Sequence, residues 1–174
     1  FAISHSTWRY AERMAFDFDY IGLQNYFPLT VKFNAFIPVI QAWEVKAKSR
    51  KKPHTKMGWE INADSFYNII KQFAAYPNIK ELMITENGAA FNDKLIDGKV
   101  NDDERIAYFE MYLSAMLKAK NEGINITGYM AWTLMDNFEW AEGHEARFGL
   151  VHVDFKTQLR TIKDSGYWWR DFLR

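Results

Sequence analysis

Apolar residues recur along this chain with two different spacings. Short runs of mostly apolar residues, such as DYIGL at residues 19–23 and ELMIT at residues 81–85, are typical of buried strands. The stretch ITGYMAWTL at residues 126–134 is a longer run of the same kind, and KMGWE at residues 56–60 is a brief one. We therefore expect strands at these four places.

Between the strands the apolar residues take the spacing of helices. One set falls at i, i+3, i+4 and i+7 and predicts the buried face of a helix, with Asn62 or Asp64 able to cap it: Phe66, Ile69, Ile70 and Phe73. A second, longer helix begins after Asn101, with Glu104 three residues on, close to a capping box, and it ends at Gly123. Its buried stripe consists of Ile106, Phe109, Leu113, Met116 and Leu117. A last helix is expected at residues 165–173.

This alternation of strands and helices predicts an α/β fold with a parallel sheet. The sheet is either open and doubly wound or part of a (β/α)₈ barrel. No glycine-rich phosphate loop follows any of the strands, which counts against nucleotide binding. Polar and aromatic residues gather where the strands end, as functional residues do in a barrel. They are Gln24, Asn25 and Tyr26, then Glu86 and Asn87, then Asp136, Asn137, Glu139 and Trp140.

Composition narrows the classes of function. With 174 residues, 48% of them hydrophobic, the chain is long enough for one domain or a piece of a larger one. Lysine plus arginine and aspartate plus glutamate both number 22, so charge gives no reason to expect nucleic acid or a membrane surface as a partner. There is no cysteine, residues 1–14 show no signal-peptide pattern, and we expect a cytoplasmic protein. The basic run of residues 46–56 is expected to be a solvated loop.

Glu86 stands at the end of a predicted strand, in the stretch ITENGAAF of residues 84–91. Asn-Gly directly after it is a strong turn signal. The glutamate is either a solvated charge at the start of a loop or a carboxylate held at the mouth of a barrel for chemistry.

The stretch AWTLMDNFEWAEGHEARFG of residues 131–149 combines Trp132, Glu139, Trp140 and Phe148. Indole faces pack against the apolar faces of sugars, and carboxylates and amides hydrogen-bond their hydroxyls. The stretch therefore suits a sugar site. The alternative is that Trp132 and Phe148 belong to the core and Glu139 to the surface, and composition leaves both interpretations open.

The segments ITENG and WTLMDNFEWAEGHEARFGLVHVDF together closely resemble the signature segments of family 1 glycoside hydrolases, the β-glucosidase and β-galactosidase group. The resemblance continues through DFDYIGLQNYF, MGWEINADSFYNII, DDERIAYFEMYLSAMLKAKNEGINITGY and TQLRTIKDSGYWWRDFL, so that it covers nearly the whole chain. It implies that residues 1–174 are the C-terminal part, about half, of a single (β/α)₈ catalytic domain. It also implies a retaining β-glycosidase, first of all a β-glucosidase, that acts on small β-glycosides and needs no metal or organic cofactor.

The same resemblance implies roles for individual residues. Glu86, in the Thr-Glu-Asn-Gly motif, matches the nucleophile that forms a covalent glycosyl-enzyme, and Tyr26 matches a tyrosine that orients it. Glu139 and Trp140 match residues that bind the outer hydroxyls of the sugar. The residues that match the floor and wall of the sugar site are Trp132 and Phe148.

One stretch departs from the commonest family pattern. Members often read Gly-x-Asn-Tyr-Tyr, whereas this chain reads Gly22-Leu23-Gln24-Asn25-Tyr26. Aligned without a gap, Gln24 replaces an asparagine near the substrate and becomes a candidate for substrate binding. An alignment with one inserted residue would give that role to Asn25.

A retaining glycosidase also needs a carboxylic acid to protonate the departing oxygen. The family places it in an Asn-Glu-Pro motif, which this sequence lacks; its only Asn-Glu pair, at residues 121–122, lies near the end of the long helix. We therefore expect the N-terminal part of the domain, with the acid, to be missing and to be a candidate partner, and the chain alone to have little turnover. The alternative is a non-catalytic carbohydrate-binding or scaffold half-barrel.

Overall fold

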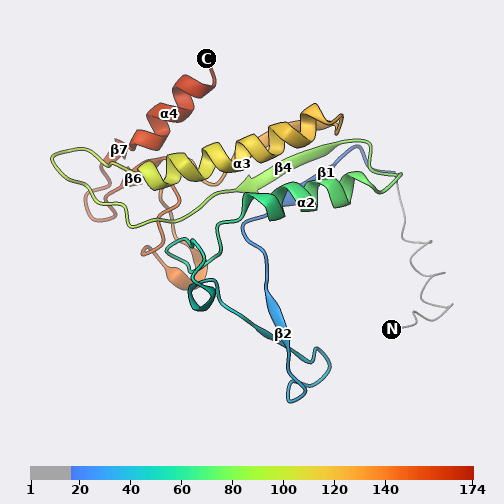
Figure 1. The fold of residues 1–174 in the computed structure, drawn as a ribbon. Helices are drawn as coiled ribbons and strands as arrows, with labels where there is room; N and C mark the ends of the chain where they lie inside the picture. Colours follow the sequence, from blue (N-terminus) through green and yellow to red (C-terminus); the bar gives the residue numbers. More distant parts are fainter. Residues whose placement is uncertain (1–16) are drawn as a thin grey trace.

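The computed structural model of the protein describes residues 17–174, so residues 1–14, which show no signal-peptide pattern, lie outside the described residues. The body of the molecule is a three-stranded parallel sheet in the order β1-β4-β5 (Figure 1). Its strands are Ile21–Gln24 (β1), Leu82–Asn87 (β4) and Ile126–Ala131 (β5). The expected strands at residues 19–23, 81–85 and 126–134 are confirmed, with shifted ends.

Three helices accompany this sheet: Ala63–Ala74 (α2), Asp103–Asn121 (α3) and Asp164–Phe172 (α4). Helix α3 packs against both α2 and α4, and Figure 1 shows α2 and α3 running along the sheet. Because α3 connects β4 to β5 and the strands are parallel, the expected strand–helix alternation is present. The carboxyl ends of the three strands therefore meet at one edge of the sheet.

Two antiparallel hairpins and two short 3-10 helices complete the described residues. The hairpins pair Val31–Phe33 (β2) with Ala42–Glu44 (β3), and Val151–Val153 (β6) with Arg160–Ile162 (β7). The 3-10 helices are Lys48–Arg50 (η1) and Trp140–Glu142 (η2).

The core lies between the sheet and its helices. Leu23, Ile84 and Ile126 of the strands are buried in one cluster with side chains of all three helices. The helix side chains include Phe66, Ile70, Phe109, Leu113, Met116 and Trp169. This burial fixes the sheet, and with it the direction in which the residues after each strand project.

The register of the sheet changes where the strands end. Leu23 of β1 pairs with Ile84 of β4, but the next residue, Gln24, pairs with Glu86. The irregularity skips Thr85 and places Gln24 directly beside the glutamate.

Two local predictions are wrong, and a third is wrong in part, because Leu117 of the expected buried stripe of α3 is 41% exposed. Residues 56–60 do not form a strand, because Gly58, with φ of +76°, donates its amide to the carbonyl of Thr55 in a tight turn that a single bridge between His54 and Glu60 closes. The cap of α3 is Asp102 instead of Asn101, and its carboxylate makes no capping bond to the helix. That carboxylate accepts hydrogen bonds from Ser165 instead.

The β2–β3 hairpin extends away from the body of the molecule (Figure 1). Several large apolar side chains on it are exposed, among them Phe33 at 75%, Phe36 at 93% and Ile40 at 75%. Across residues 17–174, no helix has both the length and the apolar character that crossing a bilayer requires.

Candidate active site

The carboxylate of Glu86 is held at the end of β4 by two donors from the neighbouring strand and the residues after it. Gln24 Nε2 donates to Oε1 at 2.7 Å, and Tyr26 Oη donates to Oε2 at 2.7 Å. Each oxygen of the carboxylate therefore has one fixed donor. Two interpretations of Glu86 were open. The geometry favours a carboxylate held in place, because both of its oxygens accept hydrogen bonds from the protein, which a solvated charge in a loop would not need.

Tyr26 is suited to be a donor because it stays protonated. Burial, the hydrogen bond to Glu86 and the negative charge of that carboxylate raise the pKa of Tyr26 far above its ordinary value of 10.0. Glu139 adds to the same rise through its charge, so this second carboxylate is near enough to act on Tyr26.

Asn87, directly after Glu86, is completely buried and joins four segments. Its Nδ2 donates to the carbonyl of Asn25 at 2.7 Å and to Tyr108 Oη at 2.9 Å, and its Oδ1 accepts from Tyr129 Oη at 2.6 Å. The two strands beside β4 and helix α3 are therefore locked to the residue next to the glutamate. Apart from the position of Asn87 at a strand end, no pattern in the sequence indicates this role.

Gly88 does not make the turn that Asn-Gly predicts. It is buried, and a Cβ placed on it would lie 1.8 Å from the carbonyl oxygen of Trp132. The amide of Trp132 donates to the carbonyl of Asn87 at 2.8 Å. Glycine is needed here because the backbone of Trp132, in the sugar-site stretch, lies directly against it.

An aromatic group stands beside Glu86. The rings of Tyr26, Trp59 and Phe148 lie with centroids 5.3 Å (Tyr26–Trp59), 5.9 Å (Trp59–Phe148) and 6.3 Å (Tyr26–Phe148) apart. Trp132 packs against the same cluster, and Phe148 is buried in it. The structure therefore brings Trp132 and Phe148, the residues expected to form the floor and wall of a sugar site, together with Tyr26. Trp59 was missed by the sequence analysis, although its MGWE segment is among those that resemble the family.

Glu139 and Trp140 lie at the start of η2. The amide of Glu139 donates to the carbonyl of Gly143 at 2.6 Å, which closes a small loop. Trp140 is 83% exposed, and it forms none of the ring contacts found among the residues that the structure describes. Its indole is open to solvent, whereas Trp132 is half-buried.

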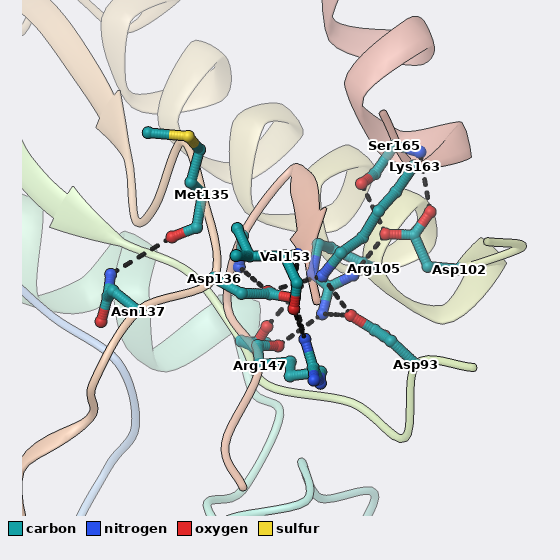
Figure 2. A network of polar contacts seen from close by, with 12 residues as sticks. Asp93, Asp102, Arg105, Met135, Asp136, Asn137, Arg147, Val153, Lys163 and Ser165 are labelled. Atoms are coloured by element: carbon teal, nitrogen blue, oxygen red, sulfur yellow. Dashed lines mark hydrogen bonds and ion pairs between the residues drawn. The ribbon is translucent and has the colours of Figure 1, made fainter. Parts of the chain in front are cut away.

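Asp136, one of the polar residues at the strand ends, points into a buried ionic network (Figure 2). It accepts from Lys163 Nζ at 2.8 Å and from Arg147 Nη1 at 2.6 Å. Burial alone would raise the pKa of Asp136, but the charges and hydrogen bonds of Lys163 and Arg147 outweigh it and lower that pKa. Asp136 therefore anchors the stretch that carries Glu139 and Trp140.

Neither Glu60 nor a metal cluster adds to the site. Glu60 is buried against Arg50 and accepts from Asn62 at 3.2 Å, which is a structural role. In residues 17–174 no group of three or more His, Cys, Asp or Glu side chains is arranged to hold a metal ion.

Comparison with known proteins gives consistent matches. The family model "Glycosyl hydrolase family 1" matches residues 9–174. Beta-glucosidase A of Thermotoga maritima is 44% identical over 157 residues, 90% of this chain and 34% of that protein. A 6-phospho-beta-galactosidase of Clostridium acetobutylicum is 43% identical over 119 residues, 68% of this chain and 25% of that protein.

Solved structures give matches to the same family. The Thermotoga maritima family 1 glycoside hydrolase complexed with a cyclophellitol analogue transition state mimic is 41% identical, with a TM-score of 0.88 over 97% of this chain and 37% of that one. The chain thus spans about a third of the length of the relatives it matches. Its sheet and helices are part of a (β/α)₈ barrel. The chain belongs to family 1 of the glycosyl hydrolases.

Proposed function

We propose that this chain supplies the nucleophile and part of the sugar site of a retaining β-glycosidase, with β-glucosides as the first substrate class. One observation carries the proposal: Glu86 sits at the tip of a core strand with both carboxylate oxygens hydrogen-bonded, by Gln24 and Tyr26. A rigid strand and two donors hold the carboxylate in one orientation, as a nucleophile requires.

In the proposed reaction an oxygen of Glu86 forms a bond to the anomeric carbon while the bond from that carbon to the leaving-group oxygen breaks. The departing oxygen takes a proton from an acid, or leaves as a stable anion. Water then attacks the same carbon and releases Glu86. No Asn-Glu-Pro motif occurs in the sequence, so we propose that the acid comes from further strands of a family 1 barrel that pair with this chain.

The sugar would lie against the wall beside Glu86. We propose that Trp132 and Phe148 pack against its C–H faces, and that Glu139 and Trp140 hydrogen-bond its outer hydroxyls. Gln24 uses its amide nitrogen on Glu86, which leaves its carbonyl oxygen to accept from a hydroxyl.

The choice of glucosides rests on two observations. Glu139 precedes Trp140 in an Asn-Phe-Glu-Trp context that resembles family members acting on unphosphorylated sugars. Among the relatives, the beta-glucosidase of Thermotoga maritima matches over more of the chain than the 6-phospho-beta-galactosidase does. A direct test compares 4-nitrophenyl glucoside, galactoside and 6-phosphogalactoside as competitors of labelling.

The test of the nucleophile is intact-mass spectrometry after incubation with a 2,4-dinitrophenyl 2-deoxy-2-fluoro-β-glucoside. This substrate needs the nucleophile but almost no acid, because its leaving group departs as an anion. We expect one glycosyl adduct that maps to Glu86 and is absent in Glu86→Gln.

The alternative, a non-catalytic sugar-binding protein, gives a different result. It would bind glucose or cellobiose in a titration followed by tryptophan fluorescence, with no adduct. A folded chain with neither an adduct nor sugar binding would contradict the proposed function for the chain by itself.

A further inference from the structure

Arg105, in the first turn of α3, has a completely buried guanidinium group that binds three separate segments. Its Nε donates to the carbonyl of Ala89 at 3.3 Å, and its Nη2 donates to the carbonyl of Arg147 at 2.7 Å. Nη2 also bonds the carboxylate of Asp93 at 2.8 Å, and Nη1 bonds that of Asp102.

The two carbonyls belong to the two segments that build the candidate site. Ala89 lies three residues after Glu86, and Arg147 directly precedes Phe148. A single antiparallel bridge between Phe91 and Arg147 shows that the two segments run alongside each other at this point. Arg105 therefore holds the segment that follows Glu86 to the segment that carries the aromatic wall.

A second buried cation reinforces this connection from the other side (Figure 2). Lys163, which is completely buried, bonds the carboxylate of Asp93 and that of Asp136. Asp136 in turn accepts from the amide of Gly149 at 3.0 Å. The network balances three carboxylates against three cations: Asp93, Asp102 and Asp136 against Arg105, Arg147 and Lys163.

The geometry of Arg105 suits positioning more than simple charge balance. A lysine could neutralise the same carboxylates, but its single nitrogen could not bond the two carbonyls and the two carboxylates at the same time. The planar guanidinium sets both carbonyls at fixed distances in one plane.

We propose that Arg105 is a positioning residue that fixes the distance between the nucleophile segment and the sugar wall. The inference rests on the proposed function, since it concerns the geometry of that same site. Arg105 touches no reacting atom. It acts through the backbone of Ala89 and Arg147.

The test compares Arg105→Lys with the matched control Arg170→Lys, which changes an exposed arginine paired with Asp171. The measurement is the rate of labelling by the fluoro-glucoside against its concentration, well below the Tm of each variant. We expect Arg105→Lys to lower the rate constant at saturation about tenfold or more, because small misplacements of reacting groups cost about that much. The half-saturating concentration should change less, since the wall itself remains. Arg170→Lys should label like the unchanged chain.

A second readout needs no activity. Amide hydrogen exchange of Lys56, bonded to the carbonyl of Ala90, and of Thr133, bonded to that of Phe148, reports on the two segments that Arg105 holds. In Arg105→Lys both amides should exchange faster, while amides in the middle of α3 keep their rates.

The outcomes separate the inference from the proposed function. If Arg105→Lys lowers only the Tm and leaves labelling and the two amides unchanged, Arg105 is structural and the inference is wrong. If the unchanged chain is not labelled, the proposed function fails, and the exchange of the two amides alone decides the inference. If Arg105→Lys does not fold, Asp93→Asn, which removes the carboxylate shared by Arg105 and Lys163, is judged by the same two criteria.

Discussion

Gly88 shows how one residue sets the shape of the candidate site. A methyl group there would overlap the carbonyl of Trp132, with no flexible side chain to move aside. We expect Gly88→Ala to lower the free energy of unfolding by about 2 kcal/mol or more, as overpacking of a rigid site does. Urea unfolding followed by circular dichroism measures the change.

The matched control is Gly98→Ala. Gly98 has φ of +75° and nothing within 4 Å of a Cβ, so its substitution tests backbone conformation without overlap. We expect it to cost about 1 kcal/mol. Equal costs at the two glycines would contradict the close approach of Trp132 to Gly88.

The hydroxyl of Tyr26 is the second residue-scale test. Tyr26→Phe keeps the ring beside Trp59 and Phe148 but removes the donor to Glu86. Hydrogen bonds to charged groups contribute about 1.5–3 kcal/mol, so labelling should slow by about 10- to 100-fold. Tyr67→Phe, which removes a hydroxyl bonded to exposed Glu122, should leave the rate unchanged. A Tyr26→Phe chain that labels normally would refute this role of the hydroxyl.

Single residues differed in how far the sequence could predict them. Glu86 and Tyr26 were recognised because their motifs are specific, and the structure places them in contact. Gln24 was expected near the substrate, but its bond to Glu86 depends on a register irregularity that no local pattern shows. Arg105 was missed because a helix position with one charge looks solvent-exposed until the tertiary fold surrounds it.

At the scale of elements, strand β6 carries a buried histidine with an unusual environment. His152 is 8% exposed, and its Nδ1 has no hydrogen-bond partner among the described residues. Burial and the nearby positive charges of Arg147 and Lys163 lower the pKa of His152, although Asp136 and Asp93 oppose this.

The sign of the pH effect follows from that shift. The unfolded chain takes up a proton on His152 near pH 6.5, while the folded protein resists it until a lower pH. Stability should therefore fall as the pH drops below about 6.5. The contribution of His152 to this loss is measured from the urea midpoints of the unchanged chain and of His152→Asn, each at pH 7.5 and pH 5.5. If the urea midpoint falls equally in both proteins between pH 7.5 and pH 5.5, His152 does not cause the loss of stability.

Elements were predicted best where burial repeats over many residues. The face of α2 was predicted correctly because its apolar residues recur at helical spacing. On α3 the prediction was correct for Phe109, Leu113 and Met116, but Leu117 is 41% exposed, and Tyr108 and Tyr112 are buried instead. Residues 56–60 were misjudged because a five-residue run cannot distinguish a strand from a turn that Gly58 closes. The cap of α3 shifted by one residue because a tertiary contact with Ser165 uses the carboxylate of Asp102.

At the scale of the whole molecule, the β2–β3 hairpin exposes apolar side chains far from the core. Exposed apolar patches promote association. We expect Phe36→Ser combined with Ile40→Lys to reduce self-association and to change the Tm little, because neither side chain is buried. Sedimentation velocity over a concentration series measures the degree of self-association. The control is Lys48→Ser, which changes an exposed residue of the 3-10 helix η1, after the hairpin. If self-association is unchanged in this variant, the surface responsible for it does not depend on Phe36 and Ile40.

The order β1-β4-β5 leaves β1 and β5 with one neighbour each in the sheet formed by residues 17–174. Backbone amides and carbonyls along such borders can accept another strand. Here the border strands flank Glu86. Under the proposed function, a separately made polypeptide that completed the sheet and carried an acid would therefore allow sugar cleavage only when the two chains meet. The arrangement therefore offers a split reporter, in which the colour of a released nitrophenol measures whether two fused proteins have come together.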